Sequence, residues 1–162
     1  MSNNLPAKAD QYKVHGHSFS KTEYQIIQAS GSQVIKEMKD FMVVNPLRVA
    51  IIRAELNCTT PKSEKLSDKS IDSAVNEVYD WILSSKATIR IDEATLAITL
   101  GSRGEYDDIV YFSVESCIKW IKKYLAQKNH ILQIERKARE KEDIRIQQEK
   151  AAHIDRDWET IS

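Results

Sequence analysis

The chain has 162 residues, with 24 Lys and Arg against 24 Asp and Glu, and 41% of its residues are hydrophobic. This composition is that of one soluble domain, and no apolar run approaches the roughly 18 residues that a membrane helix needs. The N-terminus also lacks the apolar stretch of a signal peptide, so we expect a cytoplasmic protein without a membrane partner.

A flexible leader is expected at residues 1–19, which are polar and show neither helical nor strand periodicity. Ordered structure should begin at Ser20, because Ser20 and Glu23 have the spacing of a capping box. Tyr24 and Ile27 supply the apolar face of this first helix, and Gly31 ends or bends it.

Two further helices are predicted before residue 57. A second helix from Ser32 carries an apolar stripe of Val34, Ile35, Met38, Phe41 and Met42. Asn45 and Pro46 favour the start of a third helix, whose inner face is formed by Leu47, Ala50, Ile51 and Ala54. Because β-branched residues are dense in residues 47–56, a buried strand is the alternative for this segment.

Residues 57–69 read as an exposed connection, since they are rich in Thr, Ser, Lys and Pro without any period. A strong helix signal follows from Ser70, with one apolar face of Ile71, Ala74, Val75, Val78, Trp81 and Ile82. The N-terminal half of the protein is therefore expected to be helical.

The spacing of the apolar residues then changes from the 3.6-residue repeat of a helix to the two-residue repeat of a strand. Ile89 and Ile91 alternate with polar residues, as do Leu96, Ile98 and Leu100 further along. Together with residues 109–112, these runs predict a small antiparallel three-stranded sheet and hence an α+β fold.

A last helix is expected from Ser113, with an inner side formed by Cys117, Ile118, Ile121, Tyr124, Leu125 and Leu132. Residues 20–134 would thus form the globular domain. Residues 135–162 are highly charged and have few large apolar groups, so we interpret them as a long C-terminal helix projecting as an arm, with a tail.

No pattern for catalysis, cofactor binding or metal binding is found. The motifs HExxH, CxxC, GxSxG and the phosphate loop are absent, and His15-Gly16-His17 lacks further ligands at suitable spacing. Two cysteines, Cys58 and Cys117, are too few for a disulfide scaffold and are expected to be buried thiols. We therefore predict a protein that is not an enzyme and has no cofactor; an enzyme whose active-site residues are dispersed along the chain, and so form no motif, is the weaker alternative.

A basic stretch at residues 119–139 is the first candidate binding surface. Its cations are Lys119, Lys122, Lys123, Lys128, Arg136, Lys137 and Arg139, opposed only by Glu135. Such a surface attracts phosphates, so a nucleic-acid-binding regulator is one hypothesis. Trp120 and Tyr124 lie four residues apart beside Ile121, and this spacing favours packing inward over stacking on bases.

The tail is the second candidate and the favoured one. Ile154, Trp158 and Ile161 follow the i, i+4, i+7 spacing of side chains that dock one helix face on a partner. The leading hypothesis is a non-enzymatic protein-interaction module, a regulator or inhibitor of a larger protein assembly. We also expect it to be a homo-oligomer, with a homodimer as the simplest form.

Overall fold

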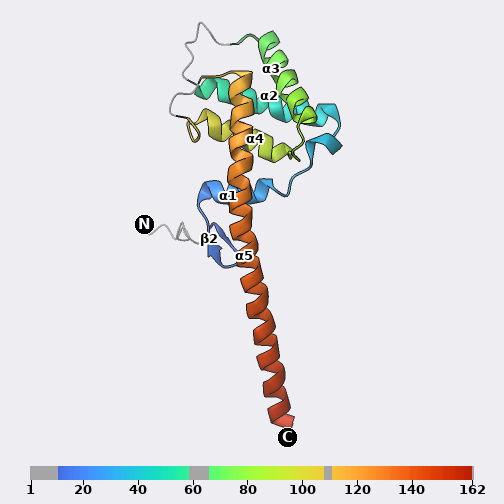
Figure 1. Cartoon of the computed structure of the whole chain (residues 1–162), viewed down its shortest axis with the longest axis vertical. Helices are drawn as coiled ribbons and strands as arrows, with labels where there is room; N and C mark the ends of the chain where they lie inside the picture. The colour runs from blue at the N-terminus through green and yellow to red at the C-terminus, as the bar shows by residue number, and fades with distance from the viewer. Residues whose placement is uncertain (1–10, 59–65, 108–110, 162) are drawn as a thin grey trace, which may run out of the picture. The chain divides into compact units, whose positions relative to one another are not determined.

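The computed structural model describes residues 11–58, 66–107 and 111–161, the last three of these by their backbone alone. The fold is mostly helical with a small two-stranded antiparallel sheet, and is α+β in this broad sense. The elements in chain order are β1 (Lys13–Val14), β2 (His17–Ser18), α1 (Lys21–Ala29), the 3₁₀ helix η1 (Ile35–Glu37), α2 (Asp40–Asn57), α3 (Asp68–Ser84), α4 (Ile91–Ser102) and α5 (Val114–Ile161) (Figure 1).

The chain divides into two compact units. One runs from Gln25 to Lys128, and the other combines the described residues of Met1–Tyr24 with those of Asn129–Ser162. The boundaries fall inside α1 and α5, so each of these helices contributes to both units. The predicted domain limits at residues 19/20 and 134/135 do not coincide with them.

Helix α1 begins as the capping box predicts. The Glu23 amide donates to Ser20 Oγ at 3.1 Å, and the Ser20 amide donates to Glu23 Oε1 at 2.9 Å. These two bonds satisfy amides that have no partner within the first turn of a helix.

The helix predicted from Ser32 is wrong, as is the helix start at Asn45 and Pro46. Val34 is extended and forms an antiparallel bridge with Arg90, in which the Ile35 amide donates to the Ile89 carbonyl at 3.0 Å and the Ile91 amide donates to the Gln33 carbonyl at 2.9 Å. The only helix between this bridge and α2 is the short 3₁₀ helix η1. Helix α2 then starts at Asp40 and contains Pro46 in its interior. Its buried face includes Leu47, Ala50, Ile51 and Ala54, which confirms the helical interpretation of residues 47–56 over the strand alternative.

Helix α3 confirms the strongest helix prediction. Ser67 caps it by accepting from the Ser70 amide, and its buried residues are Ile71, Ala74, Val75, Val78, Tyr79 and Ile82. The Tyr79 hydroxyl donates to Asp40 Oδ1 at 2.7 Å, which ties α3 to the first turn of α2. This hydrogen bond, together with burial, raises the pKa of Tyr79 to about 12.

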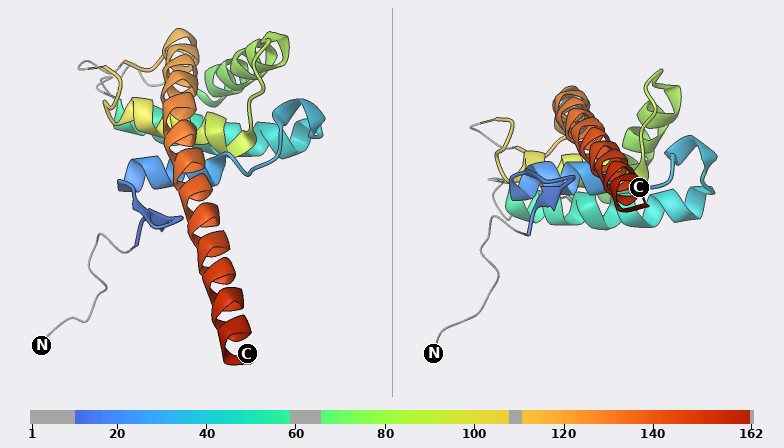
Figure 2. Two further views of the ribbon diagram at one scale, coloured as in Figure 1. Left: turned by 60° about the horizontal axis from the view of Figure 1, so that its bottom comes forward. Right: turned by 90° about the horizontal axis from the view of Figure 1, so that it is seen from below.

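The predicted three-stranded sheet is wrong. Residues 91–102 form helix α4, residues 111 and 112 are not in a strand, and residues 108–110 lie outside the described residues. Helix α4 packs beside α2, as both views in Figure 2 show. Helix α4 is buried on most sides. A helix buried in this way has no polar stripe, so its sequence does not show the 3.6-residue repeat of an amphipathic helix.

Trp120 of α5 packs directly on α4. The ring lies so close to Gly101 that a Cβ atom at this position would overlap it. Trp120 and Tyr124 are both fully buried, which confirms that they pack inward. Cys117 and Ile121 are buried beside them as predicted, whereas Ile118, Leu125 and Leu132 are half-buried.

The two-stranded sheet lies within the stretch for which the sequence predicts an irregular leader. Val14 pairs with His17, so the loop consists of His15 and Gly16 alone, with φ of 50° and 76°. Positive φ at both loop residues is the geometry of a type I′ turn, which suits Gly and is tolerated by His. Residues 11–19 are thus a β-hairpin, and residues 1–10 lie outside the described residues.

Candidate functional site

The C-terminal part of α5 is the most exposed helix surface in the described chain. We call residues 143–158 the exposed segment, because each of their side chains is exposed to solvent. Arg145 donates to Glu142 at 2.7 Å and to Glu149 at 2.5 Å, and such pairs support helix without burying apolar surface. The hydrogen bond from Arg145 holds the pKa of Glu142 below its ordinary value.

The predicted anchors lie on this helix. The side chain of Ile154 is 57% exposed and that of Trp158 is 69% exposed. Helix α5 extends to Ile161, whose side chain is outside the described ones. The expected long C-terminal helix is therefore present, and the spacing of Ile154 and Trp158 places them on one face of it.

The cations of the basic stretch differ in the groups that they contact. Lys119 and Lys123 both contact Asp107 Oδ1, at 3.0 and 3.1 Å, and Trp120 Nε1 donates to the other oxygen at 3.3 Å. Hydrogen bonds from the two lysines lower the pKa of Asp107. These two lysines therefore hold the loop before α5, and their charges are already compensated.

Lys128 has an internal partner as well. Its Nζ lies 2.7 Å from Glu93 Oε2, with side chains 15% and 0% exposed. The neighbouring Tyr124 hydroxyl has no hydrogen-bond partner among the described residues, and burial raises the pKa of Tyr124 strongly. Lys122 lies over the Trp81 ring at 5.8 Å, the geometry of a cation–π contact.

The other cations of the stretch lie on the second unit. Arg136 contacts Glu140 at 3.9 Å on the helix surface, and Lys137 and Arg139 are exposed. Within the described chain, these three are the only ones of the seven predicted nucleic-acid-binding residues that form no ion pair, hydrogen bond or cation–π contact with another element.

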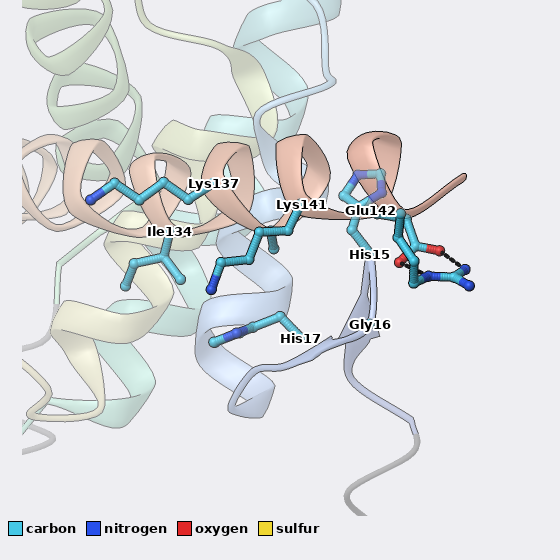
Figure 3. Close-up of a pocket in the computed structure, with 9 residues that line it drawn as sticks. His15, Gly16, His17, Ile134, Lys137, Lys141 and Glu142 are labelled. Carbon is cyan, nitrogen blue, oxygen red and sulfur yellow. Dashed lines mark hydrogen bonds and ion pairs between the residues drawn. The ribbon is translucent and has the colours of Figure 1, made fainter. Parts of the chain in front are cut away.

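A groove of about 420 Å³ lies between the hairpin and α5 within the same unit. Lys141 and His17 point into this opening, and Ile134 forms part of its wall (Figure 3). His15 Nε2 lies 3.1 Å from Glu135 Oε1, which fixes the hairpin turn against the helix. The sequence signal for this feature is the His-Gly pair between Val14 and His17, a short hairpin turn.

The histidines of the hairpin do not converge on a metal site. His15 contacts Glu135, and the His17 ring packs against the Phe19 ring in a tilted arrangement, with 4.7 Å between centroids. Across residues 11–58, 66–107 and 111–161, no three His, Cys, Asp or Glu side chains are arranged to hold an ion. Cys58 and Cys117 are both buried and are not joined in a disulfide, and burial raises the pKa of Cys117 to about 12.

An exposed apolar surface on α2 was not predicted. Phe41 and Leu56 are 66% and 65% exposed, and Met42 and Val49 are exposed too. The sequence pattern predicts Phe41 and Met42 on the apolar stripe of a helix from Ser32, whereas in the structure both are exposed, because α2 turns this side away from α3 and α4. The signal was available, since α2 is apolar on nearly all sides and a single core cannot cover them all.

No family model, curated protein or solved structure matches this chain. In the part of the chain that is described, none of the helices combines the length and apolarity required to cross a bilayer.

Proposed function

We propose that this chain is a non-enzymatic protein-interaction module, a cytoplasmic regulator or inhibitor of a larger protein assembly. It acts through the C-terminal helix and tail, with Ile154, Trp158 and Ile161 as the anchors. The same proposal includes self-association of the chain.

One observation carries this proposal. The exposed segment keeps Ile154 and Trp158 in solvent on a regular helix, although charged side chains surround them. Exposed apolar groups of this size lower solubility, and Trp is the residue type most enriched among interface hot spots. A helix that presents apolar residues at this spacing is a common form of peptide recognition.

Affinity capture from host-cell extract tests the proposal. Full-length protein should retain a specific partner, and Trp158→Ala should reduce the retained amount about tenfold or more, because truncating a buried aromatic anchor costs on the order of 2 kcal/mol. His153→Ala is the matched control, since His153 is also exposed on this segment but lies on another face. Equal capture by wild type, Trp158→Ala and a chain ending at Glu142 would reject the proposal.

A nucleic-acid-binding regulator is the alternative. The ion pairs of Lys119, Lys123 and Lys128 with Asp107 and Glu93 reduce the free charge of the stretch, so the alternative depends on Arg136, Lys137 and Arg139. Retardation of DNA or RNA at low salt by the wild type, and its loss on changing these last three residues to Gln, would favour this alternative.

A further inference from the structure

The exposed segment of α5 carries a heptad pattern. Counted with Ile144 at position a, successive a and d positions hold Ile144, Gln147, Ala151, Ile154, Trp158 and Ile161. Alternating steps of three and four residues keep one narrow face in line, since this repeat drifts by only about 20° per heptad from the α-helical turn. We call these six positions the seam.

The seam does not continue the face that α5 buries within its own unit. The buried residues there are Ile131 and Ala138, and the half-buried Glu142 follows on the same stripe. Ile144 comes two residues after Glu142, which places it about 200° further around the helix. The described seam residues are all exposed, and none of them lines the groove against the hairpin.

We propose that the seam pairs with the seam of a second copy of this chain as a parallel, in-register, two-stranded coiled coil. This inference rests on the proposed function, because it names the partner that the exposed segment binds. In a coiled coil, each side chain at an a or d position inserts into a space formed by four side chains of the facing helix, and two helices with the same a/d stripe can pair in this way.

Charges beside the seam are complementary in a parallel pair of two copies. In a parallel pair, the g residue of one helix lies near the e residue of the next heptad on the other. Lys150 is at g and Asp155 is at e, so the symmetric dimer forms this attractive pair twice. Asp143 at g meets Gln148 at e, so no like charges oppose each other among these flanking positions.

The polar seam position supports the same register. In the parallel pair Gln147 faces Gln147 of the second copy, and the two amides can donate to and accept from each other. An antiparallel alignment of the six positions would set Gln147 against Trp158 instead. A polar residue within an apolar seam commonly fixes register in this way.

The helix is already formed before pairing. Residues 131–142 pack within their own unit, so the costly first turns of the helix exist and the exposed segment extends from them. A seam of this limited length, which would be marginal as a free peptide, therefore loses less conformational entropy on pairing.

Sedimentation equilibrium on full-length proteins tests the pairing. The wild type should dimerise, and Lys150→Asp and Asp155→Lys should each weaken the homodimer roughly tenfold, because each replaces two attractive pairs by two repulsive ones. An equimolar mixture of these two variants should associate like the wild type, as should the double variant, because opposite charges meet again. His153→Glu, at the exposed position c outside the seam and its flanks, is the control and should leave the dissociation constant unchanged.

A wild type that stays monomeric at the highest concentration tested overturns the inference, as does a mixture that associates no better than its components. Circular dichroism should show the same helix content in all variants. A monomeric wild type that still captures another protein through Trp158 leaves the proposed function standing and rejects self-pairing. A dimer that follows the charge rule while capturing nothing else supports self-pairing and rejects a larger assembly as the partner.

Discussion

Lys128 is a candidate nucleic-acid-binding residue by its charge, but in the folded protein it forms an ion pair with Glu93 in the interior. Glu93 is fully buried, and Lys128 is the one cation that reaches it among the described residues. A buried carboxylate without a counter-charge is unfavourable by several kcal/mol. The position of Lys128 is therefore explained by folding, with no ligand required.

Replacing Lys128 by Met should lower the free energy of unfolding by about 3 kcal/mol, because Glu93 would remain buried and unpaired. Urea denaturation at pH 7 measures this change. Lys122→Met is the control on the same helix and should change the value by only about 0.5 kcal/mol, as is usual for exposed sites. The double variant Glu93→Leu/Lys128→Met should recover most of the loss, and a double variant less stable than Lys128→Met would contradict this explanation.

At the scale of elements, Asp107 links the loop before α5 to the helix through Lys119, Lys123 and Trp120. The lysines lower the pKa of Asp107 in the folded protein, so the folded state favours the charged carboxylate. The resulting stabilisation is present above the unfolded-state pKa of roughly 4 and is lost as the pH falls through the folded-state pKa.

Asp107→Asn should accordingly lower the melting temperature near pH 7, and the difference from the wild type should shrink on acidification below about pH 4. Thermal melts of both proteins across this range provide the measurement. Asp143→Asn, on the exposed segment, is the control and should give a small difference at every pH. If the difference in melting temperature between Asp107→Asn and the wild type grew as the pH fell, the expected direction of the pH dependence would be wrong.

Local signals predicted some elements and missed others for identifiable reasons. The caps at Ser20 and Ser113 and the apolar stripe from Ile71 to Ile82 predicted α1, α3 and the start of α5, because each depends on residues within one or two turns. Helix α4 was missed because its burial hides the helical period and leaves a pattern resembling alternation. Asp92 and Glu93, in its first turn, are the residue types that favour a helix N-terminus.

The candidate site was predicted only in part for a similar reason. The helical tail follows from local composition, whereas the partners of Lys119, Lys123 and Lys128 lie on other segments. Spacing along one helix cannot reveal a carboxylate such as Glu93, which tertiary packing alone brings to Lys128. The heptad pattern of the seam, by contrast, is present in the sequence. It is recognised only when Ile144 and Ala151 are included in the same pattern as Ile154 and Trp158.

At the scale of the whole molecule, most of the exposed large apolar side chains of the described chain lie on α2 and α5. Their concentration on two helices is typical of interaction proteins, because monomeric proteins rarely expose such side chains together. The exposed segment differs from the rest of α5 in having no buried side chain, whereas Ile131 and Ala138 pack within the unit that contains the hairpin.

Ending the chain at Glu142 should therefore leave the fold intact. The melting temperature of this variant, measured at a concentration where self-association is negligible, should stay within about 3 °C of the wild type, since surface pairs such as Arg145 with Glu142 contribute at most about 1 kcal/mol. Ending the chain at Asn129 instead removes the buried Ile131 and Ala138 from the unit that contains the hairpin, so a clear loss of stability is expected. Equal destabilisation by both truncations would mean that the exposed segment belongs to the folded core, and its role as a free docking helix would then be untenable.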